Sequence, residues 1–169
     1  MLYTAYTDAD VALTAATAKT SLYVIPPSGF GYNLCVVEVG AEFEGAVQAT
    51  DCLAELVEST AATAGTSGSA AGCKQIRGSR AISPTAAVTS TGLGLTINKA
   101  YSAEPTVLSA LYAPFKLPNG QSMVWQFPLD TGPEFPAPAA SPAAAFGLRL
   151  TSPIAVAARC HITFAVGWR

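Results

Sequence analysis

Apolar and polar residues alternate along several short segments of the chain, and turn residues separate these segments. A period of two places successive side chains on opposite faces of a strand. No window combines a helical period with convincing caps, so the pattern predicts strands. The expected strands are residues 20–25, 32–43, 46–58, 92–100, 123–127, 145–151 and 154–168. Residues 51–59 are the best helix candidate, but they also fit a strand.

The clearest alternation lies in the last of these segments. One parity is wholly apolar and consists of Ile154, Val156, Ala158, Cys160, Ile162, Phe164 and Val166. The opposite parity carries Arg159, His161 and Thr163. We therefore expect one face of this strand to pack in a core and the other to meet a wetter environment.

Turn residues between the segments indicate the architecture. The Asn119-Gly120 pair is typical of a tight hairpin, and the proline-rich residues 133–142 fit an extended or edge segment. Several short strands separated by turns favour a sandwich or a jelly roll. The sequence thus predicts an all-β fold, an antiparallel, jelly-roll-like β-sandwich, with residues 1–169 in a single domain.

Two segments are candidates for structure outside the body of this domain. Residues 60–72 are rich in Gly, Ser and Ala and predict a flexible loop. Residues 1–12 are a candidate N-terminal arm. The sequence leaves open whether residues 1–10 form an ordered arm that reaches a neighbouring subunit or a frayed end.

Charge is scarce in this chain. Charged residues make up 12% of the 169 residues, with a net charge of −2 and a pI near 5.3. The usual charged share is about twice as large. The balance excludes the basic footprint of a nucleic-acid-binding protein, and no stretch approaches the roughly 18 apolar residues of a membrane helix. We expect neither nucleic acid nor membrane as a partner. Surfaces buried in oligomers are poor in charge, while an alanine-rich coding habit explains the composition equally well.

The charges are also divided unevenly. Residues 1–58 contain eight acids and one base, whereas residues 59–169 contain eight bases and three acids, which gives net charges of −7 and +5. This division favours contacts between subunits in which an acidic patch meets a basic one. Intermixing of the two sets within one folded chain is the alternative.

The residues that commonly carry chemistry form no known motif. Cys35, Cys52 and Cys160 lie in apolar segments and are expected to act as small buried hydrophobes. Cys73 is expected to be the most exposed thiol, and a disulfide between Cys73 and Cys52 stays open. His161 directly follows Cys160, so the two side chains point to opposite faces. His161 is better explained as a surface or interface histidine, with pH sensing as a lesser alternative. The sequence predicts no enzyme, no metal site and no cofactor.

Both ends of the chain resemble a known group of proteins. Residues 13–27 (LTAATAKTSLYVIPP) and residues 123–168, above all the run GLRLTSP followed by Ala155, Val156 and Arg159, are similar to segments of small tailed-phage virion proteins. The resemblance covers about half of the chain and leaves residues 45–109 unmatched. It implies a β-sandwich or jelly-roll subunit in a phage particle, arranged in rings or trimers on the capsid.

The resemblance leads to a functional expectation. The protein is expected to be a capsid decoration (cement) protein that binds the major capsid protein or other virion proteins. Its expected location is the virion, assembled in the host cytoplasm, and its expected state is a homo-oligomer, with a trimer favoured. A tail, neck or fibre component and a carbohydrate-binding module are the alternatives; the latter would stack sugars on Tyr101, Tyr112, Trp125 or Trp168.

Five residues are candidates for the interface: Arg149, Arg159, His161, Trp125 and Trp168. The two arginines are expected on adjacent strands around the turn at Ser152-Pro153. They could pair across strands with an acid or reach an acidic patch on a neighbour. Two solvated surface arginines are an equally good interpretation.

Overall fold

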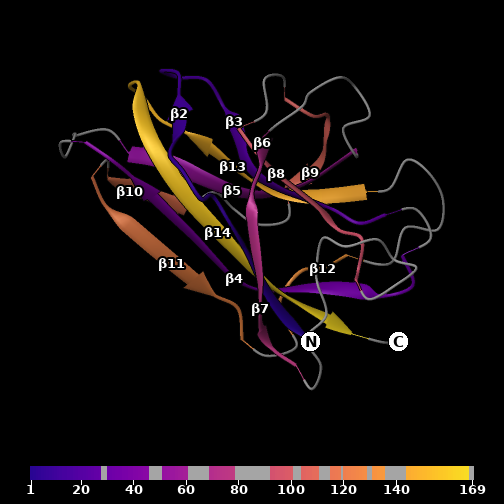
Figure 1. Ribbon diagram of the computed structural model, residues 1–169. Helices are drawn as coiled ribbons and strands as arrows, with labels where there is room; N and C mark the ends of the chain where they lie inside the picture. The colour runs from indigo at the N-terminus through magenta and orange to yellow at the C-terminus, as the bar shows by residue number, and fades with distance from the viewer. Residues whose placement is uncertain are drawn as a thin grey trace.

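The computed structural model describes residues 1–27, 30–45, 51–60, 69–78, 92–100, 104–110, 115–118, 120–128, 131–135 and 144–167. These residues form strands, turns and bends and contain no helix (Figure 1). The strands build two antiparallel sheets that pack face to face, which confirms the predicted β-sandwich. Residues 51–59, the best helix candidate, lie in a strand.

Sheet 1 is formed by seven strands. They are β1 (Leu2–Tyr6), β2 (Val11–Leu13), β4 (Asn33–Phe43), β7 (Gly72–Arg77), β11 (Ser122–Gln126), β12 (Glu134–Phe135) and β14 (Val156–Gly167). The strand order is β11-β4-β14-β1-β7, while β12 also pairs with β4 and β2 also pairs with β14. Among the described strands, β11 and β12 therefore lie along one edge of sheet 1, and β7 lies at the other edge, beyond β1.

Sheet 2 is also formed by seven strands. They are β3 (Lys19–Ile25), β5 (Asp51–Thr60), β6 (Ser69–Ala70), β8 (Thr96–Lys99), β9 (Val107–Ala110), β10 (Phe115–Pro118) and β13 (Ala144–Thr151). The order is β10-β5-β13-β3-β8-β6, and β9 also pairs with β5.

The strand pairs are nested along the chain. β1 pairs with β14, β3 with β13, β4 with β11, and β5 with β10. Each successive pair lies inside the previous one in sequence, and the pairs alternate between the two sheets. This is the connectivity of a jelly roll, in which one long hairpin is wrapped into two facing sheets. The structure therefore supports the jelly-roll prediction as well as the sandwich.

Strands β6, β7 and β8 lie in sequence between the two members of the innermost pair. β7 extends sheet 1 beyond β1, and β8 and β6 extend sheet 2 beyond β3. The predicted flexible loop over residues 60–72 is wrong at both ends, because Thr60 is the last residue of β5, Ser69–Ala70 pair with β8 and Gly72 begins β7. Residues 61–68 lie outside the described residues. Small residues carry a weak strand signal, yet their backbones can still complete a ladder offered by a neighbouring strand.

The first residues form neither a free arm nor a frayed end. β1 lies inside sheet 1 between β14 and β7, and Tyr3 and Ala5 are completely buried. The backbone N–H of Val166 also donates to the carbonyl of Met1. The N-terminal arm expected over residues 1–12 is thus corrected: Leu2–Tyr6 and Val11–Leu13 are strands of the domain.

The hairpin expected at Asn119-Gly120 is wrong as well. Gly120 has the positive φ of a turn, 77°, but β10 before it belongs to sheet 2 and β11 after it to sheet 1. The turn therefore leads the chain from one sheet to the other. Local turn chemistry predicts a change of direction; the apolar faces of β4 and β5 decide which partner each strand finds.

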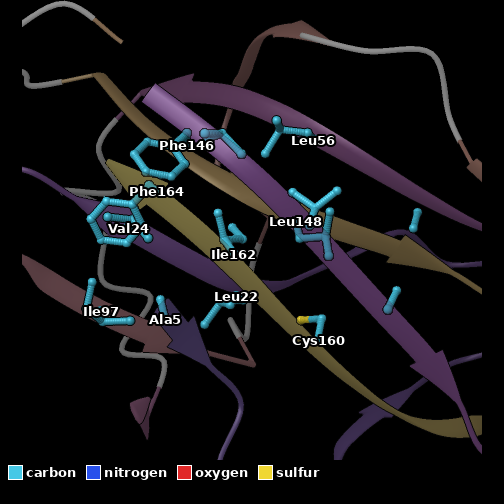
Figure 2. Close-up of a cluster of buried hydrophobic side chains, with 14 of the residues drawn as sticks. Ala5, Leu22, Val24, Leu56, Ile97, Phe146, Leu148, Cys160, Ile162 and Phe164 are labelled. Carbon is cyan, nitrogen blue, oxygen red and sulfur yellow. The ribbon is translucent and has the colours of Figure 1, made fainter. Parts of the chain in front are cut away.

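The core lies between the two sheets and is built largely from the inner faces of β14, β4, β13, β5 and β3. Figure 2 shows a part of it, to which β14 of sheet 1 and β3, β5 and β13 of sheet 2 contribute side chains. Phe164 from sheet 1 meets Phe146 from sheet 2 edge to face, with ring centroids 5.9 Å apart. The apolar face predicted for β14 is confirmed, because Ala158, Cys160, Ile162, Phe164 and Val166 are buried. On the opposite face Arg159 is exposed and His161 half-buried, as expected, but Thr163 is buried between its strand neighbours Thr4 and Glu38, so the expectation of a wetter environment is wrong there.

Candidate interaction surface

The outer faces of the two sheets differ in access. In β3 of sheet 2, the five consecutive residues from Thr20 to Val24 are all buried, so both faces of that strand are covered. In β11 of sheet 1, four of the five residues are exposed. The outer face of sheet 1 is therefore an accessible surface, and Arg159 and His161 of β14 lie on it.

Cross-strand register brings residues from four strands into rows on this face. One row runs through Tyr6, His161, Gly40 and Val124. The next row runs through Thr4, Thr163, Glu38 and Gln126. Residues in such rows are direct neighbours, so side chains far apart in sequence contact one another.

Glu38 connects the two rows by hydrogen bonds. Its Oε2 accepts from Gln126 Nε2 at 2.7 Å, and its Oε1 lies 3.0 Å from His161 Nε2. The bond from Gln126, followed by the bond and charge of His161, holds the pKa of the Glu38 carboxyl below its ordinary value despite partial burial. Glu38 is thus a carboxylate that fixes the orientation of His161.

Two glycines allow rings to lie flat on this face. A Cβ on Gly40 would stand 2.1 Å from His161 Cε1, and a Cβ on Gly72 would stand 2.3 Å from Tyr6 Cζ. Both positions therefore need a residue without a side chain if the rings are to stay where they are. Lys74 Nζ lies 5.9 Å from the centre of the Tyr6 ring.

A hollow of about 280 Å³ opens on this face. It is lined by Tyr6, Thr7, Gly40, Ala41, Glu42, Ser122, Met123, Val124, Arg159, Cys160 and His161. Its residues come from β14, β4, β11, β1 and the chain just after β1. The sequence pointed to Arg159 and His161, but not to Tyr6, Gly40 or Val124, because only the register of four strands brings them together.

The rim of the hollow near Arg159 is acidic. Arg159 Nε lies 2.5 Å from Asp10 Oδ1 and 4.0 Å from Glu44 Oε1. The hydrogen bond with Asp10, followed by the charges of Asp10, Glu44 and Glu42, raises the pKa of Arg159. Three carboxylates around one guanidinium leave an excess of negative charge at this rim.

Arg149 does not belong to this surface. It lies on β13 in sheet 2, whereas Arg159 lies on β14 in sheet 1, so the expectation of adjacent strands is wrong. The chain crosses between the sheets at Ser152-Pro153 instead of turning within one. Arg149 Nη2 pairs with Glu55 Oε2 at 2.9 Å on the neighbouring strand β5. Pairing with an acid across strands, one of the alternatives for both arginines, is observed for Arg149.

The acidic first part and the basic remainder of the chain meet within the subunit. Asp8 pairs with Lys99, Asp10 and Glu44 with Arg159, Glu55 with Arg149, and Glu38 with His161. In every one of these pairs the acid comes from residues 1–58 and the base from residues 59–169. The alternative in which folding intermixes the two sets is therefore the one that the structure shows.

Strand β11 adds an exposed apolar edge beside the hollow. Val124 is 54% exposed and Trp125 45% exposed. The Trp125 ring stacks on Phe115 of β10, with centroids 5.3 Å apart, so one of its faces is already covered. Trp168, Tyr101 and Tyr112, the other aromatic candidates, lie outside the described residues.

The four cysteines are free thiols. Cys52 and Cys160 are buried as predicted, while Cys35 and Cys73 are half-buried. The disulfide left open between Cys52 and Cys73 is absent, since the two lie on strands of different sheets. Cys73 is not an exposed thiol: burial raises its pKa to about 12.

The hydrogen bond described for the His161 ring leads to Glu38, and not to a hydroxyl or thiol that it could activate. The described residues contain no group of three His, Cys, Asp or Glu side chains placed to hold a metal ion. They also contain no helix long and apolar enough to cross a membrane.

Comparison with known proteins adds no family. Neither a scan against protein-family models nor a search of curated proteins found a match to this chain.

Proposed function

We propose that this protein is a structural component of a tailed-phage particle, where it decorates the capsid by binding the lattice of the major capsid protein. The observation that carries the proposal is the nested jelly-roll order of the strands, in a chain whose two ends resemble phage virion proteins. Jelly rolls are a frequent fold of viral capsid domains. The shared fold supports the proposal by analogy, and two features of the surface support it as well.

The surface has the character of one that lies against neighbours. Only 12% of the residues are charged, and several of these charges pair within the subunit. Val124 and Trp125 stay exposed on an uncharged edge strand. A charge-poor surface with exposed apolar groups is typical of a subunit in an assembly.

The proposed contact is the hollow on sheet 1. Asp10, Glu42 and Glu44 surround the single guanidinium of Arg159 at its rim. Such a rim favours a basic side chain from the capsid protein over an acidic one. A weak contact of this kind, repeated over the symmetric lattice, gives high avidity when several linked subunits bind together.

The copy number in purified particles tests the location. Quantitative mass spectrometry of phage particles purified from cells that produce the chain should give hundreds of copies per particle, as expected for decoration of a capsid. A few copies or a dozen would indicate the tail or neck alternative instead. Absence from the particle would refute a structural role in it.

A charge reversal tests the contact. Glu42→Arg adds a long cation at the rim of the hollow, and it should weaken binding to undecorated capsids by at least about tenfold, because like charges then meet. Glu134→Arg is the matched control, since Glu134 is exposed on β12 and does not line the hollow. Equal affinities of the two variants would refute the proposed contact while leaving the capsid role open.

A further inference from the structure

The β11 edge lacks the features that usually protect a sheet edge. Natural edge strands carry inward-pointing charges, lysines, prolines or bulges that prevent pairing with another chain. β11 consists of Ser-Met-Val-Trp-Gln, and its register with β4 is regular over all five residues. Among the described strands, none pairs with its outer side. Within the part of the chain that the structure describes, the edge is therefore open to a further strand.

The backbone groups that this edge presents follow from its bonds to β4. Phe127 N–H donates to the carbonyl of Val37, and Phe43 N–H donates to the carbonyl of Gln121. In an antiparallel ladder, alternate residues of a strand bond to the same neighbour. Odd-numbered residues of β11 thus bond to β4, and the N–H and C=O groups of Ser122, Val124 and Gln126 point away from the sheet.

We propose that a second copy of this chain pairs with β11 in an antiparallel register centred on Val124. A two-fold axis then passes between the two Val124 residues, and sheet 1 continues from one subunit into the other. Val124 bonds to Val124 of the second copy, and Ser122 bonds to Gln126 in both directions. All three outward-pointing residues find partners in this register, which no shift by one residue would allow.

The side chains of β11 are complementary to themselves in this register. No charged residue of β11 faces another, because the strand has none. On the outer face, Ser122 lies beside Gln126 and the valines lie beside each other. On the inner face, Met123 meets Trp125 of the second copy in the closer, non-hydrogen-bonded type of pair. The second copy thereby covers the exposed part of the Trp125 ring.

This pairing concerns the free chain and does not rest on capsid binding. It gives an isologous dimer in which the same patch is used by both subunits. It therefore takes the place of the trimer that the resemblance favours. The two hollows would lie on either side of the axis, because Ser122, Met123 and Val124 also line the hollow.

The mass of the full chain in solution tests the dimer. Size-exclusion chromatography with light scattering should give twice the 17.3 kDa of one chain. Val124→Lys places two ammonium groups at the axis and should weaken the dimer by roughly 100-fold, so that monomers appear. Ile76→Lys is the matched control: Ile76 is 58% exposed on β7, the opposite edge of sheet 1, and this variant should stay dimeric.

A cross-link tests the register. The Cα atoms of a hydrogen-bonded antiparallel pair lie about 5.5 Å apart, within the range that a disulfide spans. Val124→Cys should therefore give a disulfide-linked dimer under mild oxidation, and Ile76→Cys should not. A monomeric wild type, an oligomer that survives Val124→Lys, or a Val124→Cys dimer that fails to cross-link would each overturn the proposal.

Discussion

The strands β7 and β11 lie at opposite edges of sheet 1, and each has backbone N–H and C=O groups on its outer side that another chain could pair with. The two strands differ in the charge that they carry. β7 exposes Ile76, but it also carries Lys74 and Arg77, both of them exposed. β11 exposes Val124 and Trp125 and carries no charge. Each edge also has a ring lying over a nearby glycine: Tyr6 over Gly72 at β7, and His161 over Gly40 beside β11.

The difference indicates that only one edge is protected against pairing. Lysine on an edge strand makes the approach of another strand costly, because its charge would lose water. Only 12% of the residues of this chain are charged, yet two bases lie on β7 and none on β11. We infer that the two edges have different functions. The charges of β7 disfavour pairing with a further strand, whereas uncharged β11 allows sheet 1 to be extended by one.

Removal of the charges on β7 should have the largest effect. The double variant Lys74→Val and Arg77→Val leaves both edges of sheet 1 uncharged, so copies can associate at either edge and growth need not stop at a dimer. Light scattering should rise with protein concentration far beyond the dimer. The matched control Lys74→Arg with Arg77→Lys keeps both charges and should scatter like the wild type. Equal scattering by both variants would show that charge does not protect β7.

Replacing Gly40 or Gly72 by alanine should lower the free energy of unfolding by different amounts near the two edges. Gly40→Ala pushes on the His161 ring, which Glu38 holds at 3.0 Å, and it should destabilise the fold by about 1–3 kcal/mol. Gly72→Ala pushes on the Tyr6 ring, which can swing outward over Lys74. Its cost should stay within about 1 kcal/mol, since alanine also lowers the entropy of the unfolded chain. Urea unfolding measures both, and equal losses would contradict the difference in restraint.

Lowering the pH should reduce the stability of the fold on the β11 side of sheet 1, because Glu38 becomes protonated. The folded-state pKa of Glu38 is lowered, so its contribution to stability is present above the ordinary value of 4.5 and is lost as pH falls through the folded value. The loss should be at most about 1 kcal/mol, because the side chain is partly solvated.

The matched comparison is the difference in unfolding free energy between pH 6 and pH 3. Glu38→Gln should reduce this difference. Lys74→Met, on the β7 side, should leave it as in the wild type, because no carboxylate lies on Gly72–Arg77. A Glu38→Gln variant with unchanged pH dependence would remove Glu38 from this explanation.

The smallest effect is expected at Cys73, on β7. Its pKa of about 12 leaves roughly one thiolate in ten thousand at pH 8, so iodoacetamide should label it very slowly in the native protein and readily in urea. Mass spectrometry of the labelled peptide measures this. Fast native labelling would mean that β7 opens often, and the contrast between a closed and an open edge would then be weaker.

Sequence reasoning found what is local. The alternation of residues 154–168 fixes which side chains of β14 face the core, and so it places Arg159 and His161 on the outer face without knowledge of any partner strand. The same reasoning could not find the hollow. Gly40 and Val124 become neighbours of His161 only through the registers of β4 with β14 and with β11.

Charge pairing and strand order depend on distant parts of the chain in the same way. Asp10 and Arg159 are separated by 149 positions, yet they form an ion pair. The uneven division of charge was visible in the sequence, but whether it is resolved within one subunit or between two depends on the topology. For the same reason the glycine turn before β11 indicated a bend and not the sheet into which the chain would continue.

The nested order of strands also sets the timing of folding. β1 and β4 share β14 as their neighbour, and β14 ends at residue 167. Sheet 1 therefore cannot close while synthesis is at an earlier residue, and the open edges of β1 and β4 must wait for most of the chain. Contacts of such long sequence separation make folding slow. Until β14 is available, the unpaired edges of β1 and β4 are exposed to pairing with other chains.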